Sequence, residues 1–176
     1  MTDWSRISNR RVFSCPYFTL EHDRYRLPSG KESDYFYVHT LGSTMVVPRL
    51  ACGTLVLTRQ FRYLMGHTSI EFPAGGLKAG LTPLDNARQE LEEEAGYRAA
   101  SWTLIGKFSP YKGVARETCH VFLAEELEPC PPCPEETEDI EVLRATTGEL
   151  RAMIGKGEVT DGMSLAAFAL FERWEG

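Results

Sequence analysis

The sequence predicts one α+β domain in which helices cover a mixed β-sheet. Strand-like runs occupy most of the first two thirds of the chain, one capped amphipathic helix interrupts them, and two further helices close the sequence. With 176 residues, of which 43% are hydrophobic, the chain is long enough for one sizeable core and too short for two ordinary domains.

The predicted strands are runs of β-branched and aromatic residues between turns that contain glycine or proline. The first run, Val12 to Leu27, ends at a Pro28–Gly30 turn. Further strands are expected at 34–41, 44–47, 54–58, 69–72, 103–108, 118–124 and 140–145, and closing helices at 148–154 and 161–174. The Pro- and Glu-rich stretch Glu125 to Thr137 is expected to be a loop.

The central helix carries both start and stop signals. Thr82 is a suitable N-cap, Pro83 occupies the first helical position, Asp85 completes a capping-box pattern, and Gly96 is placed to end the helix. One apolar stripe at helical spacing is formed by Leu84, Ala87, Leu91 and Ala95. This stripe is expected to bury one face of the helix against the sheet.

Three glutamates share another face of this helix. Glu90, Glu93 and Glu94 are three and four residues apart, a spacing that brings side chains together. Neighbouring carboxylates repel one another, and a hard divalent cation would neutralise them, most commonly Mg²⁺. The alternative is a solvated charged face, which is where most helical charge runs lie. Glu92 falls elsewhere on the helix and is expected to face solvent.

The segment from Gly75 to Tyr97 resembles the Nudix box, G-x5-E-x7-R-E-U-x-E-E-x-G-U, where U is apolar. The positions in register are Gly75, Glu90, Leu91, Glu93, Glu94, Gly96 and Tyr97. Leu81 and Gln89 depart from the pattern, which has glutamate and arginine there. The resemblance implies an α/β/α sandwich with a mixed sheet and an N-terminal antiparallel strand region. It also implies that the missing arginine orients the glutamates; Arg88 points about 100° away around the helix.

Motifs outside the box resemble the ADP-ribose pyrophosphatase branch of this family. Arg59–Arg62 is similar to its RQ[YF]R motif, and Glu71–Gly75 to its E-L-P-A-G motif. Ser109-Pro110 followed by Glu117 is similar to an S-P-G…E loop, and the segments 135–142 and 155–167 to the ending of the branch.

The resemblance implies roles residue by residue. Metal ligands are the carbonyl of Ala74 and the carboxylates of Glu90 and Glu94. The catalytic set is Glu136 as general base, Glu138 as its alternative and a further metal contact, and Glu93 in support. Arg62, Glu71 and Glu117 are assigned to substrate binding. A solvated acidic loop is the other interpretation of the Glu135–Asp139 stretch.

The implied reaction is Mg²⁺-dependent hydrolysis, with Mn²⁺ as an alternative ion, of the diphosphate in ADP-ribose or a related nucleoside diphosphate sugar. The products would be a nucleoside monophosphate and a sugar phosphate. Alternatives are GDP-mannose as substrate, a non-catalytic ligand sensor suggested by Leu81 and Gln89, and cleanup of oxidised nucleoside triphosphates.

The overall composition limits the partners and the compartment. A formal net charge of -6 argues against a general nucleic-acid binder. No apolar run is long enough to span a membrane, and no secretory signal precedes residue 12, so we expect a soluble cytoplasmic protein with five reduced cysteines. The resemblance further implies a homodimer within a single domain of residues 1–176, with residues 1–41 in the dimer contacts and 42–176 as the core.

Three other features have two interpretations each. Cys130 and Cys133 could bind zinc with His120, but incidental surface thiols are favoured because no second Cys pair exists. His67 could line the site, although solvent exposure is favoured. Tyr35 and Phe36 could stack on a nucleobase, although strand aromatics are more often in the core.

Overall fold

The structure is a computed structural model, and it describes residues 3–131 and 139–176. Its strands form three sheets. The first has the order β1 (Ser5–Ser14), β2 (Thr19–Arg26), β3 (Glu32–His39), β9 (Ala115–Arg116). The second has the order β7 (Ala74–Gly76), β4 (Ser43–Pro48), β10 (Cys119–Pro129), β8 (Tyr97–Phe108). The third has the order β11 (Ile140–Ala145), β5 (Leu55–Arg62), β6 (His67–Glu71). The helices are α1 (Pro83–Ala95), α2 (Thr147–Gly155) and α3 (Gly162–Glu175).

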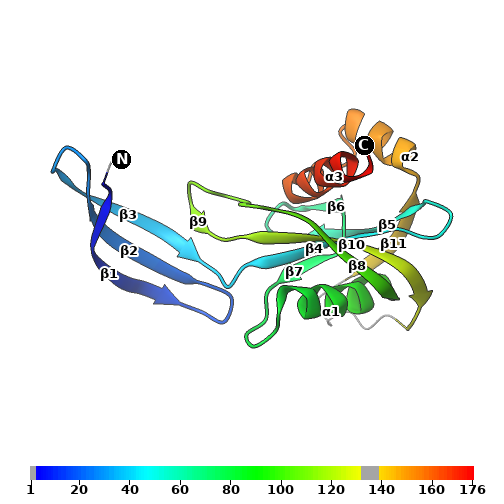
Figure 1. Cartoon of the computed structure of the whole chain (residues 1–176), viewed down its shortest axis with the longest axis horizontal. Coiled ribbons are helices and arrows are strands. Elements are labelled where there is room, and N and C mark those ends of the chain that lie inside the picture. The colour runs from blue at the N-terminus through cyan, green and yellow to red at the C-terminus, as the bar shows by residue number, and fades with distance from the viewer. Residues whose placement is uncertain (1–2, 132–138) are drawn as a thin grey trace.

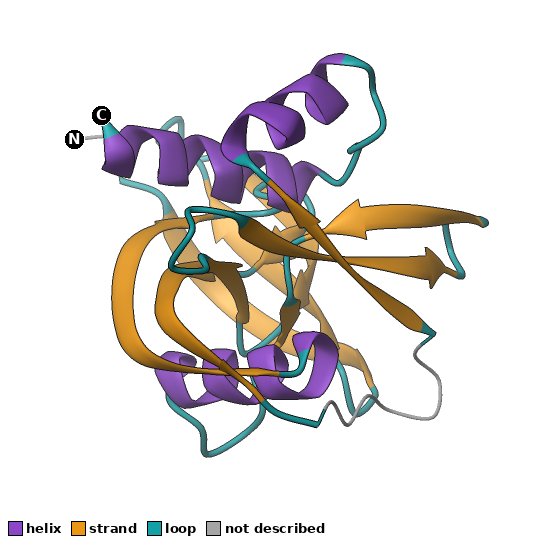
Figure 2. Ribbon diagram, turned by 90° about the vertical axis from the view of Figure 1, so that its right-hand side faces the viewer, coloured by secondary structure: helices purple, strands orange, loops and turns teal. Residues whose placement is uncertain are grey.

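Strand β4 is the centre of the body, buried along its whole length and parallel to β10. Its side chains alternate between two cores, as the pleat of a strand requires. Met45 and Val47 belong to the core that includes Phe168 of α3, whereas Val46 belongs to the core that includes Leu91 of α1. Figure 2 shows helices above and below the strands. The predicted α+β class and the layered sandwich are therefore confirmed.

Helix α1 forms where its local signals predict it. The hydroxyl of Thr82 accepts a hydrogen bond from the Asp85 backbone N–H at 3.2 Å, which satisfies one of the free donors of the first turn. Gly96 ends the helix with a φ of 67°, a left-handed conformation that glycine adopts without a Cβ penalty. Of the predicted stripe, Ala87, Leu91 and Ala95 are buried and Leu84 is partly buried.

The N-terminal sheet projects from the body as a separate arm (Figure 1). The expected single run from Val12 to Leu27 is wrong: β1 begins at Ser5, and a turn at 15–18 separates it from β2, its antiparallel partner. The core placement of Tyr35 and Phe36 is also wrong, because both are exposed at 43% and 56%. Their strand, β3, has no extensive contact with a helix within the described residues, so these two aromatic side chains stay on the surface.

Strand β10 continues beyond the predicted boundary. The loop expected from Glu125 is wrong over its first part, because β10 pairs with β8 as far as the partners Pro129 and Tyr97. This pairing supplies the backbone hydrogen bonds that a loop would have left to solvent. Within the described part of the chain, no helix is long and apolar enough to cross a membrane.

Candidate active site

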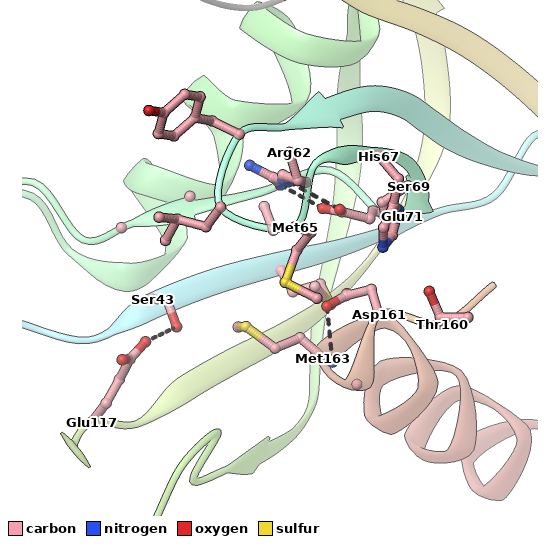
Figure 3. A pocket seen from close by; sticks show the side chains of 17 residues that line it. Ser43, Arg62, Met65, His67, Ser69, Glu71, Glu117, Thr160, Asp161 and Met163 are labelled. Atoms are coloured by element: carbon pink, nitrogen blue, oxygen red, sulfur yellow. Dashed lines mark hydrogen bonds and ion pairs between the residues drawn. The ribbon is translucent and has the colours of Figure 1, made fainter. Parts of the chain in front are cut away.

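A cavity of about 700 Å³ lies beside the central strand (Figure 3). Its walls come from five parts of the chain: the start of β4, the β5–β6 hairpin with its connecting turn, β7, the segment between β9 and β10, and the segment that enters α3. Segments far apart in sequence thus meet at one concave surface, which is the usual form of a small-molecule site.

Arg62 and Glu71 form an ion pair in the wall of this cavity (Figure 3). They lie near opposite ends of the β5–β6 hairpin, and the Arg62 guanidinium donates through both Nε, at 2.9 Å, and Nη2 to the Glu71 carboxylate. Glu71 is buried, whereas the Arg62 side chain is 41% exposed. The hydrogen bonds to Glu71 raise the pKa of Arg62, so the guanidinium is a permanent, anchored positive charge beside the cavity.

Glu117 reaches the same cavity from the segment between β9 and β10. Its carboxylate accepts a hydrogen bond of 2.7 Å from the Ser43 hydroxyl (Figure 3). Ser43 begins β4 and is the register partner of Gly76 in β7. The three residues predicted to bind substrate, Arg62, Glu71 and Glu117, are therefore brought together at one cavity.

The carboxylates of the α1 face meet the backbone of β7. Glu94 Oε2 accepts a hydrogen bond of 2.9 Å from the Ala74 backbone N–H. Glu90 lies so close to Gly75 that a Cβ added there would fall 2.3 Å from its carboxylate. Both glutamates are buried, at 7% and 4% exposure. A solvated charged face is thus excluded for Glu90 and Glu94, while Glu92 does point outward and pairs with Arg98.

Strand β7 borders both the cavity and the carboxylates of Glu90 and Glu94. The residues of β7, Ala74 to Gly76, line the cavity, while Glu90, Glu93 and Glu94 are not among its lining residues in the part of the chain described. Among residues 3–131 and 139–176, no group of three His, Cys, Asp or Glu side chains surrounds a single point. Glu136 and Glu138, the predicted bases, lie outside the described residues.

The donor chemistry at β7 fits a hard divalent cation. Two buried carboxylates converge on a backbone segment, and oxygen ligands of this kind are those that Mg²⁺ prefers. The absent Cβ of Gly75 is what lets the Glu90 carboxylate reach this segment. Glu93 is the more exposed neighbour, and its Oε2 lies 3.1 Å from the Lys78 ammonium.

The sequence analysis missed three residues of the site, namely Asn86, Lys78 and Asp161. Asn86 is fully buried, and its Nδ2 donates to Glu90 Oε1 at 3.3 Å. Its position four residues before Glu90 could have revealed this contact. Asp161 lines the cavity and caps α3 by accepting from the Ser164 backbone N–H at 2.7 Å. His67 is exposed, as favoured, but it also lines the cavity (Figure 3).

The zinc set that the sequence analysis disfavoured is not assembled by its two described members. His120 lies within β10 and Cys130 follows the end of that strand, so at about 3.3 Å per residue they are on the order of 30 Å apart. The third member, Cys133, lies outside the described residues. Burial of His120 in the sheet lowers its pKa.

Known proteins resemble this chain in both sequence and fold. The model of the NUDIX domain family matches residues 40–161. The chain is 35% identical to the ADP-ribose pyrophosphatase of Bacillus subtilis (strain 168), over 92% of this chain and 88% of that protein. It is 32% identical to the GDP-mannose pyrophosphatase of Pectobacterium atrosepticum, over 76% and 74%.

Among solved structures, one described as an ADP compounds hydrolase superposes with a TM-score of 0.85, covering 97% of this chain and 93% of that one. The identity there is 20%, so this likeness concerns the fold alone. Together, the glutamate helix packed on β7, the layered fold and the match over residues 40–161 establish that the chain belongs to the Nudix family.

Proposed function

We propose that this protein hydrolyses the diphosphate bond of ADP-ribose or a related nucleoside diphosphate sugar, releasing a nucleoside monophosphate and a sugar phosphate. The observation that carries the proposal is the junction at β7, where the buried Glu90 and Glu94 meet the strand that lines a cavity with an anchored Arg62. Two relatives, an ADP-ribose pyrophosphatase and a GDP-mannose pyrophosphatase, support this substrate class.

A divalent ion, Mg²⁺ in our proposal, would be held by the Ala74 carbonyl and the carboxylates of Glu90 and Glu94, with Glu93 in support. When bound, such an ion neutralises phosphate charge and lowers the pKa of a coordinated water. Nudix hydrolases generally use divalent metals, and the oxygen-only donor set here favours Mg²⁺ over a softer ion.

The chain's own residues have separate tasks in this proposal. Arg62 offers its guanidinium to the substrate phosphates, where a fixed positive charge stabilises the charge that develops during hydrolysis. Glu71 holds Arg62 in place through both carboxylate oxygens, which reduces the freedom lost on binding. Glu117, tied to Ser43, stands at the cavity wall. A glutamate of the 132–138 segment, Glu136 or Glu138, accepts the proton of the attacking water.

A substrate panel tests the activity. Protein and Mg²⁺ are incubated with ADP-ribose, GDP-mannose, other nucleoside diphosphate sugars and nucleoside triphosphates, and phosphate release through added phosphatase is followed. We expect turnover of at least one nucleoside diphosphate sugar. Preference for GDP-mannose would change the named substrate but keep the reaction, whereas tight binding without any turnover would favour a sensor and reject the proposal.

The substitution Glu94→Gln tests the metal role. We expect it to abolish turnover with the fold intact, because an amide keeps the shape of the side chain and removes its charge. Glu92→Gln is the matched control, since Glu92 is on the same helix turn but pairs with Arg98 at the surface. Wild-type turnover by the Glu94→Gln protein would refute the assignment.

We also propose a cytoplasmic homodimer that packs through the projecting N-terminal sheet. The whole of β1 is exposed, and large apolar side chains are exposed on this arm at Trp4, Phe13 and Phe36, an unusual surface for a monomer. Size-exclusion chromatography with light scattering is expected to give twice the 19.8 kDa of one chain, and a monomer mass would reject the dimer.

A further inference from the structure

Lys78 places one positive charge between two carboxylates of the α1 face. It lies in the loop that joins β7 to α1, and its Nζ is 3.1 Å from Glu93 Oε2 and 3.8 Å from Glu90 Oε1. The two glutamates are one helical turn apart, so a single ammonium group contacts both.

The loop that carries this lysine is fastened to the same helix. The backbone N–H of Lys78 donates to Asn86 Oδ1 at 2.9 Å. The amide nitrogen of Asn86 in turn donates to Thr44 Oγ1 at 2.9 Å and to Glu90 Oε1 at 3.3 Å. Asn86 is fully buried, so this hydrogen bond ties the backbone of Lys78 to the buried side of the helix beside Glu90. The side chain itself is 44% exposed and flexible, which allows its ammonium group to withdraw.

The arginines of the helix and just beyond it make their ion pairs elsewhere. Arg88 pairs with Asp85 at 3.1 Å, and Arg98 pairs with Glu92 at 3.0 Å. Gln89, which lies four residues before Glu93 and could reach it along the helix, is exposed and uncharged. Lys78 in the loop therefore supplies the positive charge next to Glu90 and Glu93 that the uncharged Gln89 of the helix does not supply.

We propose that Lys78 is a tethered counter-ion of the carboxylate face: it stabilises Glu90 and Glu93 before a divalent cation arrives and competes with that cation. The reason is electrostatic. Close carboxylates destabilise one another unless a cation neutralises them, and an ammonium group and a divalent ion repel each other when they share the same carboxylates. Lys78 would thereby set the metal concentration at which the enzyme becomes active. The competition between Lys78 and the cation rests on the proposed function, because it requires that the α1 carboxylates bind the metal.

The test uses the whole chain, freed of metal with a chelator, and Mn²⁺ alone as probe. Free Mn²⁺ is followed by electron paramagnetic resonance during titration, and Tm is measured with and without the ion. For Lys78→Met we expect Mn²⁺ to bind about two- to fivefold more tightly, the range that partly exposed ion pairs support. We also expect a lower metal-free Tm and a larger rise of Tm on adding Mn²⁺.

Two variants serve as controls. Lys78→Arg keeps the charge and is expected to bind Mn²⁺ within twofold of wild type. Lys156→Met removes a lysine that pairs with Glu158 at 3.9 Å, away from the α1 face, and is expected to change neither measurement.

The outcomes separate this inference from the proposed function. If Lys78→Met binds Mn²⁺ as wild type does, or more weakly, while its circular dichroism spectrum is unchanged, the competition is overturned. If its metal-free Tm equals that of wild type, the counter-ion role is overturned. If Glu94→Gln leaves Mn²⁺ binding unchanged, the metal assignment of the proposed function fails, and the metal-free Tm of Lys78→Met still decides the counter-ion role.

Discussion

A single methyl group at residue 75 would disturb the packing of the carboxylate face on β7. In Gly75→Ala, the new Cβ would lie 2.3 Å from Cδ and Oε1 of Glu90 and 2.5 Å from Oε2. Ordinary van der Waals contact begins at 3.4 Å, so the carboxylate must retreat by roughly 1 Å. Gly75 has no positive φ, so the disturbance is a clash rather than backbone strain.

The surroundings of Glu90 make this retreat unfavourable. Glu90 is 7% exposed and accepts a hydrogen bond from the buried Asn86, so its carboxylate cannot swing freely into solvent. Overpacking of a tight interior typically destabilises by about 1–3 kcal/mol. A displacement of about 1 Å at a catalytic group can lower the rate on the order of 10²-fold. We expect both effects in Gly75→Ala, together with weaker Mn²⁺ binding.

Gly76→Ala is the matched control, because its methyl group would meet nothing within 4 Å. Urea denaturation and Mn²⁺ titration are run on both variants and on wild type. We expect Gly76→Ala to match wild type in the free energy of unfolding and in Mn²⁺ affinity. The reasoning is refuted if Gly75→Ala also matches wild type in both measurements, since the carboxylate would then not depend on the absent Cβ.

Two further predictions concern a buried charge and the thiols. Arg62→Met leaves the buried Glu71 carboxylate unpaired and should lower the free energy of unfolding by about 1–3 kcal/mol, less than for a fully buried pair because Arg62 is 41% exposed. Glu71→Gln removes the buried charge itself and should lower the free energy of unfolding less. Equal losses for the two variants in urea denaturation would contradict this reasoning. Alkylation with iodoacetamide at pH 8, followed by peptide mass spectrometry, should label Cys52 well before Cys119. A hydrogen bond with Thr54 lowers the pKa of the exposed Cys52, whereas burial raises the pKa of Cys119 to about 11 and leaves about one Cys119 thiolate in a thousand at this pH. Equal labelling of both cysteines in the folded protein would contradict the burial of Cys119.

Local sequence signals were sufficient for the helix and for most strands. The cap at Thr82, the stop at Gly96 and the stripe through Leu91 all act within one or two turns, so they could be recognised without tertiary contacts. The spacing of Glu90 and Glu94 also follows from the helix alone. For the same reason, the motif that identifies the family could be located in the sequence.

Tertiary structure decided everything that depends on pairing between distant segments. Whether Phe36 is buried depends on which element covers β3, and the end of β10 depends on its register with β8, so both expectations failed. Arg62 and Glu117 line the same cavity because the sheet brings their segments together, and no short-range sequence pattern indicates that they are neighbours. The contact of Lys78 with Glu93 has the same origin: a loop folds back onto a helix face, and only the packing of β7 against α1 brings the two charges together.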